Sequence, residues 1–179
     1  MSVRPILAVV LGLALAGCQS MPREPLDTVS GLDLERFMGD WYVVGSIPSF
    51  LERDAHNAVE SYALRPDGRV ATTFRFRDGA FDGPLEVYEP TGFVSPDDNA
   101  VWGMQFVWPI KAEFLVLFVD QDYQRTVIGR SKRDYVWLMA RRPDLGDAEY
   151  AELVQVVADA GYDTSELRRV PQRWPEPVE

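Results

Sequence analysis

Side chains suited to catalysis or metal binding are scarce in this sequence. Its 179 residues include one cysteine and one histidine, and no glycine-rich phosphate loop is present. No catalytic constellation is recognisable, and His56 is expected to be a surface residue. Acidic pairs such as Asp97-Asp98 are better explained as turn residues than as metal ligands. We therefore expect no enzyme and no metal or cofactor.

Basic residues are also few. Lys and Arg number 18 against 28 Asp and Glu, which gives a formal charge of −10. A nucleic-acid partner is not expected, because phosphate backbones are bound by clustered basic side chains. The length suits one domain, and 12% aromatic residues with 13 glycines and 13 prolines favour an all-β chain with many turns.

The first twenty residues have the organisation of a secretory signal. Arg4 precedes the apolar stretch 6–16, which is too short to span a membrane. Leu15-Ala16-Gly17-Cys18 resembles the bacterial lipobox, which implies cleavage before Cys18, lipidation of that cysteine and an envelope lipoprotein. Gln19 resembles the outer-membrane sorting state. The alternative is a plain signal with a chance cysteine.

Four segments follow from this interpretation. We expect a lipoprotein signal peptide at 1–17, a lipidated tether at 18–30, a folded domain at 31–172 and a tail at 173–179. Because Cys18 is the only cysteine, no internal disulfide can form, and the fold depends on its core.

Strand-like runs alternate with explicit turns along the folded domain. One such turn is Arg65-Pro66-Asp67-Gly68. The predicted strands are 41–47, 55–64, 69–77, 84–94, 100–107, 113–120, 123–131 and 134–141. Only the connection 48–54 is long, and its apolar Phe50 and Leu51 suggest a lid or rim over a cavity, with a packed loop as the alternative.

One helix is predicted after the strands. Tyr150, Leu153, Val154, Val157 and Ala158 recur with helical spacing.

Asp147 is its expected N-cap and Gly161 its expected stop. We expect residues 165–170 to return as a short strand beside the first, and 174–179 to form a loose tail. Eight meandering strands can close into an up-and-down barrel, so the predicted fold is an all-β, eight-stranded antiparallel barrel with this helix packed outside.

Three motifs then resemble a known family. Residues 34–42, which end in Gly39-Asp-Trp41-Tyr42, resemble the first motif of the lipocalins with its short helix. Residues 120–123 resemble the second motif, with Gln121 where threonine is usual, and residues 135–143 resemble the third. From the lipobox to about Gln172 the chain resembles a bacterial lipocalin of the outer-membrane lipoprotein type.

The resemblance implies a closed end and an interior. It places Arg141 over Trp41 at the closed end of the barrel, beside Gly39, in a cation–π contact. The alternative is that Arg141 is a surface residue and that Arg142 takes its role. With Arg141 inward, strand alternation places Met139, Trp137 and Tyr135 inward too. The family register adds Ala58, Glu60, Tyr62, Thr72, Phe74, Trp102, Met104, Phe106, Phe114, Val116, Phe118, Val127 and Gly129.

The expected lining is aromatic and mostly uncharged, which suits acyl chains. The expected ligand-binding residues are Tyr62, Thr72, Phe74, Trp102, Met104, Phe106, Val116, Phe118, Tyr135, Trp137 and Met139, with Phe50 and Leu51 at the rim. A barrel filled by these side chains is the alternative. Whether Glu60 and Glu89 face inward stays open, because a buried carboxylate is costly and a bulge could turn either outward.

The leading functional expectation is a non-enzymatic carrier or store of fatty acids or lysophospholipids. Its lipid anchor would hold it to the outer membrane, facing the periplasm. An envelope protein-interaction module with a filled barrel is the second possibility. The third is a lipocalin-type enzyme, for which Glu60, Tyr62, Thr72 and Tyr135 are the candidate groups. A homodimer is compatible with all three.

Overall fold

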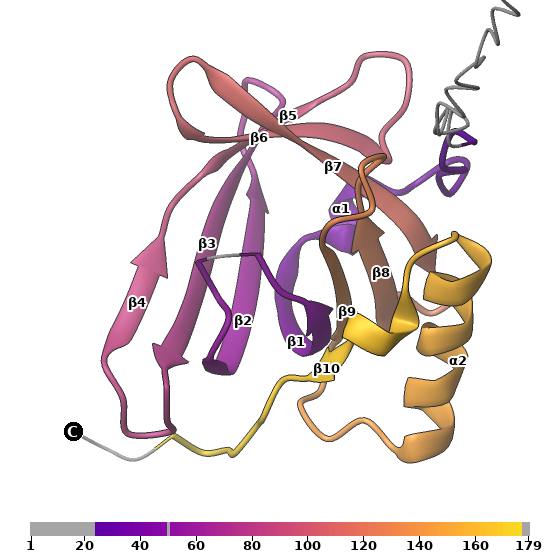
Figure 1. Cartoon of the computed structure of the whole chain (residues 1–179). Coiled ribbons are helices and arrows are strands. Elements are labelled where there is room, and N and C mark those ends of the chain that lie inside the picture. Colours follow the sequence, from indigo (N-terminus) through magenta and orange to yellow (C-terminus); the bar gives the residue numbers. More distant parts are fainter. Residues whose placement is uncertain (1–23, 50, 177–179) are drawn as a thin grey trace, which may run out of the picture.

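The strands of the chain form one closed antiparallel sheet (Figure 1). The computed structural model describes residues 24–49 and 51–176. Closure occurs because the first strand pairs with both the second and the ninth. The elements are α1 (Leu34–Phe37), β1 (Gly39–Ile47), β2 (Ala55–Leu64), β3 (Arg69–Asp78), β4 (Leu85–Tyr88), β5 (Thr91–Val94), β6 (Val101–Val107), β7 (Ile110–Val119), β8 (Arg125–Gly129), β9 (Val136–Ala140), α2 (Asp147–Asp159), a 3₁₀ turn (Thr164–Glu166) and β10 (Arg168–Arg169).

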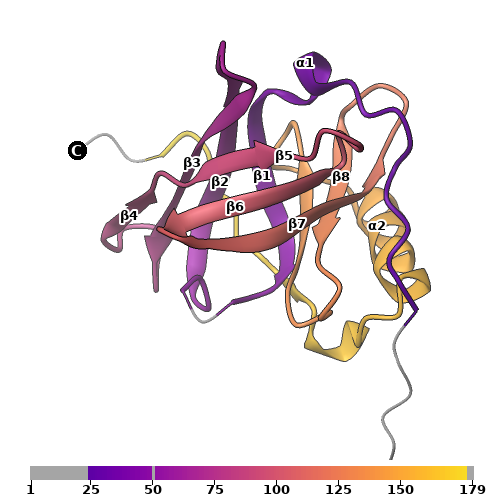
Figure 2. The ribbon, with the colours of Figure 1, turned by 90° about the horizontal axis from the view of Figure 1, so that it is seen from above.

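The predicted eight-stranded barrel with one helix outside is confirmed. The predicted strand 84–94 is broken at Glu89-Pro90 into β4 and β5, which pair with successive parts of β3. When β4 and β5 are counted as one strand, the barrel has eight strands. The expected extra strand is present as β10, which pairs with β1. Figure 2 shows β5, β6 and β7 crossing over one side of the barrel while α2 lies against the other.

Helix α2 covers the outer face of β8 and β9. Its Leu153 and Val157 are fully buried there. The expected N-cap is one residue wrong, because Gly146 is the cap and Asp147 is the first helical residue. At that position the negative charge of Asp147 still interacts favourably with the positive end of the helix dipole. Gly161 ends the helix as expected, with φ at +77°.

A bulge at Leu117 changes which side chains of β7 face the interior. Val116 pairs with Ile128, but Phe118 pairs with Val127, so Leu117 has no partner. Phe118 and Val127 consequently pack beneath α2, whereas Ile128 lies inside the barrel. The predictions that Phe118 and Val127 face the interior are wrong.

Gly129 also lies on the outer face, contrary to prediction. A Cβ atom at this position would be 2.3 Å from the Tyr162 hydroxyl oxygen. That hydroxyl accepts a hydrogen bond from the Arg130 amide at 2.8 Å and donates one to the Arg130 carbonyl at 3.0 Å. Only glycine leaves room for this bridge between the turn after α2 and the end of β8.

The C-terminal segment 171–176 forms a strap across the barrel wall. β1 pairs with β2 only from Gly39 to Tyr42. Beyond Tyr42, toward Ile47, the strap joins the two strands. The Asn57 amide donates to the Pro171 carbonyl at 2.9 Å, and the ring of Trp174 packs edge-on against Tyr42. In Figure 1 the yellow segment runs from β10 toward the lower ends of β3 and β4. The prediction of a loose tail is therefore wrong as far as residue 176, and 177–179 lie outside the described residues.

Candidate ligand-binding site

The closed end of the barrel is built around Trp41 and Arg141. The Arg141 guanidinium lies 3.8 Å from the centroid of the Trp41 ring, so the expected contact is present. Arg141 also donates to the carbonyls of Met38 and Asp40, both at 2.8 Å. Gly39 has φ at +93°, and a Cβ there would be 3.3 Å from Arg141 Nη1. Arg142 is not the partner of Trp41, because it forms an ion pair with Glu149 outside the barrel.

Five aromatic side chains fill the closed half of the barrel. Phe37 of α1 lies centrally, with its ring centroid 5.2 Å from Trp41, 5.6 Å from Tyr62 and 5.7 Å from Trp102. Trp102 stacks on Phe114 at 4.9 Å. Each of the five is at most 3% exposed. These five residues, Phe37, Trp41, Tyr62, Trp102 and Phe114, form an aromatic plug, and neither of the two cavities described next is lined by any of them.

Two adjoining cavities occupy the open half. The inner cavity has a volume of about 200 Å³ and is lined by Ser49, Leu51, Glu52, Phe74, Tyr88, Phe106, Ala112, Arg130, Tyr135 and Trp137. The outer cavity has a volume of about 570 Å³ and is lined by Leu51, Tyr88, Glu89, Pro90, Met104, Phe106, Val107, Ile110 and Ala112. Because four residues line both, the outer cavity is the entrance to the inner one.

The predicted ligand-binding residues divide into three groups. Those that line at least one of the two cavities are Phe74, Met104, Phe106, Tyr135 and Trp137, together with Leu51 of the predicted rim. Those buried without lining either cavity are Tyr62, Thr72, Trp102, Val116 and Met139. Phe118 faces α2, as described above, and Phe50 lies outside the described residues. Glu52, Tyr88 and Arg130 were not predicted, although each lies in or beside a strand end that borders the open half.

Glu52 fixes the loop 48–54 over the mouth. Its Oε1 atom accepts hydrogen bonds from Trp137 Nε1 and from the Ser49 amide, both at 2.9 Å. Burial raises the pKa of Glu52, and these hydrogen bonds oppose the rise. A carboxyl group from a loop thereby anchors a tryptophan of the cavity wall, which supports the predicted lid or rim.

Glu60 and Glu89 differ in orientation. Glu60 is 1% exposed inside the barrel, and burial raises its pKa to about 8. Tyr62 lies close enough to lower that pKa, yet neither its hydroxyl nor Glu60 Oε2 has a hydrogen bond of normal geometry to another described residue. Glu89 is exposed at the outer cavity. Of the two acids left open by the sequence, Glu60 is therefore inside.

Arg130 is the basic residue among those that line the inner cavity. Its guanidinium lies 4.4 Å from the centroid of the Tyr135 ring and forms an ion pair with Asp134. The Tyr135 hydroxyl donates to the Glu113 carbonyl at 2.7 Å. A positive charge at the mouth and apolar walls behind it suit an amphiphile that enters tail first.

Other surface features contribute less. A larger hollow of about 640 Å³ lies outside the barrel, between residues 24–27 and α2. His56 is half-buried and packs edge-on against Phe81 at 4.9 Å. Within the described part of the chain, no group of three or more His, Cys, Asp or Glu side chains is placed to hold a metal ion. No helix among the residues described is long and apolar enough to cross a membrane.

A closed antiparallel barrel with a helix alongside and an apolar cavity at one end defines a barrel protein for small hydrophobic ligands. A lipocalin-like domain matches residues 32–172, and the chain belongs to this family. The family predicted from the three motifs is confirmed.

Relatives cover most of the chain. Temperature-induced lipocalin-1 of Arabidopsis thaliana is 30% identical over 162 residues, which cover 84% of each protein. Outer membrane lipoprotein Blc of Escherichia coli K12 is 24% identical over 174 residues, 96% of this chain and 98% of that protein. Among solved structures, insecticyanin from the tobacco hornworm Manduca sexta superposes with a TM-score of 0.66 at 14% identity, covering 86% of this chain and 87% of that one.

Proposed function

We propose that the protein is a non-enzymatic lipid-binding lipocalin, anchored in the outer membrane through Cys18, that carries or stores fatty acids or lysophospholipids. The observation that carries the proposal is the apolar cavity pair in the open half of the barrel. The bacterial relatives named outer membrane lipoproteins support the location. Cys18 itself lies outside the described residues, so the anchor rests on the lipobox.

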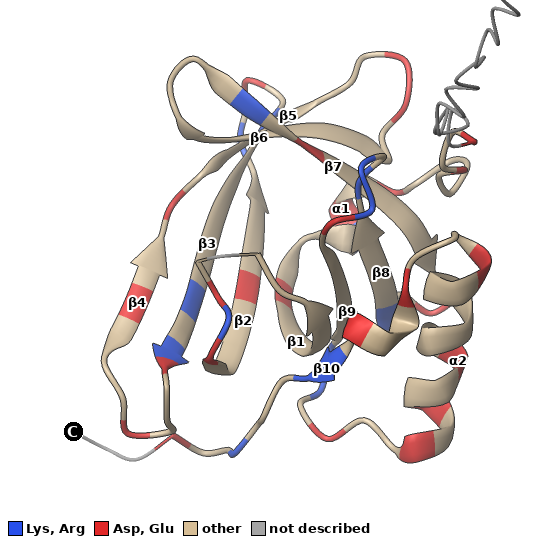
Figure 3. Ribbon diagram, viewed as in Figure 1, with Lys and Arg blue, Asp and Glu red and all other residues tan. Residues whose placement is uncertain are grey.

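The rim of the mouth supports a lipid ligand. The β6–β7 hairpin exposes Phe106, Val107, Trp108 and Ile110 at 43%, 68%, 81% and 70%. Its tip carries no charged residue (Figure 3). Exposed apolar side chains gathered at one place indicate an interaction site, and tryptophan suits the boundary between water and lipid.

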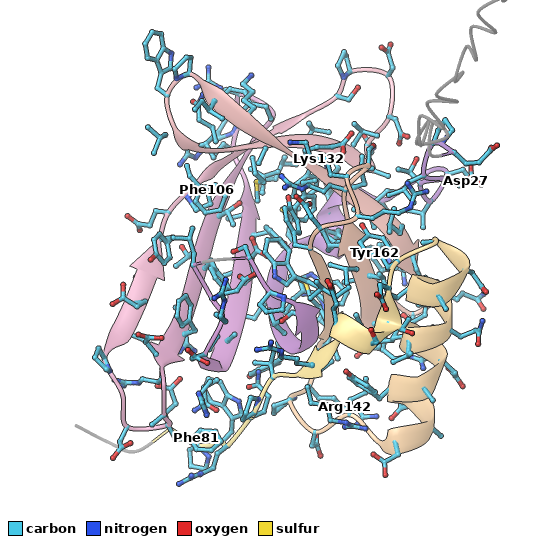
Figure 4. All side chains as sticks on the ribbon, in the orientation of Figure 1. Asp27, Phe81, Phe106, Lys132, Arg142 and Tyr162 are labelled. Carbon is cyan, nitrogen blue, oxygen red and sulfur yellow. The ribbon has the colours of Figure 1, made fainter. Side chains whose placement is uncertain are left out.

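The start of the described chain lies beside the loop that joins β8 to β9. Arg133 Nη2 donates to the Glu24 carbonyl at 2.8 Å, and Arg133 belongs to the loop whose Arg130 and Tyr135 line the inner cavity. Figure 4 labels Lys132 of that loop between Phe106 on one side and Asp27 on the other. Cys18 precedes Glu24 by six residues, a reach of about 20 Å at most. A lipid on Cys18 would therefore hold the mouth toward the bilayer from which ligands come.

The expected energetics are sufficient for a carrier. Each methylene removed from water contributes about 0.8 kcal/mol, so ten buried methylenes give about 8 kcal/mol before the cost of association. Micromolar affinity needs about the same net value, so a longer tail or head-group contacts must offset that cost. Arg130 is placed to contact an anionic head group at the mouth.

Displacement of a fluorescent fatty acid tests this proposal. The soluble chain from Gln19 onward should bind the probe saturably, and palmitate or a lysophospholipid should displace it. Phe106→Arg should weaken binding at least tenfold, because residue 106 lines both cavities. Leu64→Arg is the matched control, since Leu64 is 41% exposed and lines neither cavity. Absence of binding across fatty acids and lysophospholipids would refute the proposal.

The filled closed half gives weight to one alternative, an envelope module that holds a protein partner on its rim. Native mass spectrometry separates the two functions. Co-purified lipid supports the carrier, whereas an empty barrel with a stoichiometric protein partner supports the module.

A further inference from the structure

Three polar side chains inside the barrel have no role in the function proposed above. Glu60 and Tyr62 are two residues apart on β2 and therefore share one face of the strand. Thr72 lies directly opposite Tyr62 on β3, so all three side chains project from one wall into the interior. Their exposed fractions are 1%, 3% and 3%. Within the described residues, Glu60 Oε2, Tyr62 Oη and Thr72 Oγ1 form no hydrogen bond of normal geometry, although Glu60 and Tyr62 lie close enough to shift each other's pKa. Buried polar atoms are rarely unpaired, so three on one wall point to a partner that the chain does not supply.

This polar wall is one side chain away from the inner cavity. Phe74 lines the cavity and is the direct cross-strand neighbour of Glu60. Glu52 also lines the cavity and acts electrostatically on Glu60. A ligand in the inner cavity would have to displace the Phe74 side chain to another rotamer to approach the Glu60 carboxyl group.

The electrostatic surroundings favour a cation. The charged group that acts on Glu60 is a second acid, Glu52, and the other titratable groups of this wall and its neighbour are Tyr62 and Tyr135. Arg141 acts on Tyr62 from below, but its guanidinium is bonded to backbone carbonyls at the closed end. A positive group at this depth would be attracted to the ionised forms of both acids, and Arg130, the cation that lines the inner cavity, is held in an ion pair with Asp134.

We infer that Glu60, Tyr62 and Thr72 form a subsite for a primary ammonium group at the end of an alkyl chain. An ammonium group has three N–H donors and no acceptor, which matches three unpaired oxygen atoms. A hydroxyl group has one donor and would satisfy fewer of them. Burial holds the pKa of Glu60 at about 8, and a bound cation would lower this pKa because it favours the ionised carboxylate. The inference rests on the proposed function to the extent that the alkyl chain occupies the lipid cavity.

Calorimetric titration of the protein with decylamine, decanol and decanoate tests the subsite. We expect decylamine to bind about tenfold more tightly than decanol. At pH 7 its binding should release about 0.9 proton, because a carboxyl group of pKa about 8 is mostly protonated before the cation arrives. The release is measured by comparing phosphate and Tris buffers, whose ionisation enthalpies differ.

Two variants isolate the carboxyl group and its neighbour. Glu60→Gln should lower decylamine affinity about tenfold, abolish proton release and leave decanoate affinity within twofold. Tyr62→Phe, which removes one acceptor at nearly constant volume, should give a smaller loss. Decylamine affinity no higher than that of decanol, or unchanged by Glu60→Gln, would overturn the inference. If fatty acids bind and decylamine shows no preference, only the ammonium subsite fails; if no amphiphile binds, the lipid-carrier function fails with it.

Discussion

Glu60→Gln should make the protein less sensitive to rising pH. In the fold, burial raises the pKa of Glu60 from an ordinary value of 4.5 to about 8. Between these two values the folded chain holds a proton that the unfolded chain has lost. The wild-type free energy of unfolding must therefore fall as pH rises through this window, and the contribution of Glu60 is fully present only below about pH 4.5.

The size of the effect follows from the same two values. Each pH unit within the window corresponds to 1.36 kcal/mol, so Glu60 alone lowers the free energy of unfolding by about 3 kcal/mol between pH 5 and pH 7.5. Glutamine has the same shape and no charge to desolvate. The variant should consequently gain about 3 kcal/mol relative to wild type over this interval, whatever their difference at pH 5.

Urea denaturation followed by tryptophan fluorescence measures the difference at several pH values. Titrating groups that do not interact with Glu60 are common to both proteins and cancel, whereas the part of the difference that comes from the repulsion between Glu52 and Glu60 is removed together with Glu60. Glu89→Gln, which removes an exposed carboxylate at the outer cavity, controls for the loss of one charge. A difference between wild type and Glu60→Gln that stays constant from pH 5 to pH 7.5 would refute the burial of this carboxyl group.

Two further predictions concern the ends of the barrel. Arg141→Lys should lower the free energy of unfolding by about 2 kcal/mol in chemical denaturation, because an ammonium group cannot stack on Trp41 while bonding the carbonyls that the guanidinium reaches. Arg142→Lys should change it by less than about 0.5 kcal/mol, and equal losses would refute the role of Arg141. Truncation after Arg173 should lower the free energy of unfolding by about 2 kcal/mol, since it removes the packing of Trp174 on Tyr42 and the 2.7 Å ion pair of Glu176 with Arg75. An unchanged denaturation midpoint would show that residues 174–176 of the strap do not stabilise the fold.

Strand positions were predictable because their turns are chemically explicit. The turn at residues 65–68 has the expected glycine in the left-handed region, with φ at +78° for Gly68. The helix was predictable for a similar reason, since its apolar spacing is regular. The strap was not, because Trp174 finds its partners Tyr42 and Arg75 far away in the sequence and its flanking prolines resemble a loose tail.

The orientation of β7 could not be predicted from its composition. From Phe114 to Val119 every side chain is apolar, so no alternation distinguishes the inner face from the outer one. A bulge at Leu117 then reverses the orientation of Phe118 without leaving a signal in the sequence. Glu60 shows the opposite case. The family register placed it inward against the preference of a carboxylate for water, and the structure follows the register.

Depth in the barrel separates cavity residues from plug residues of the same type. Trp102 and Trp137 both face inward, yet Trp102 belongs to the plug and donates to the Asn99 carbonyl before β6, whereas Trp137 donates to Glu52 at the cavity. Strands of an antiparallel barrel alternate in direction, so β6 starts at the closed end and β9 at the open end. A residue near the start of β6 is therefore deep, whereas one near the start of β9 is near the mouth. The same rule puts Phe106 at the mouth and Tyr62 in the plug. Strand alternation alone therefore predicts too many ligand-binding residues, and the direction of each strand is needed to tell which inward residues lie near the mouth.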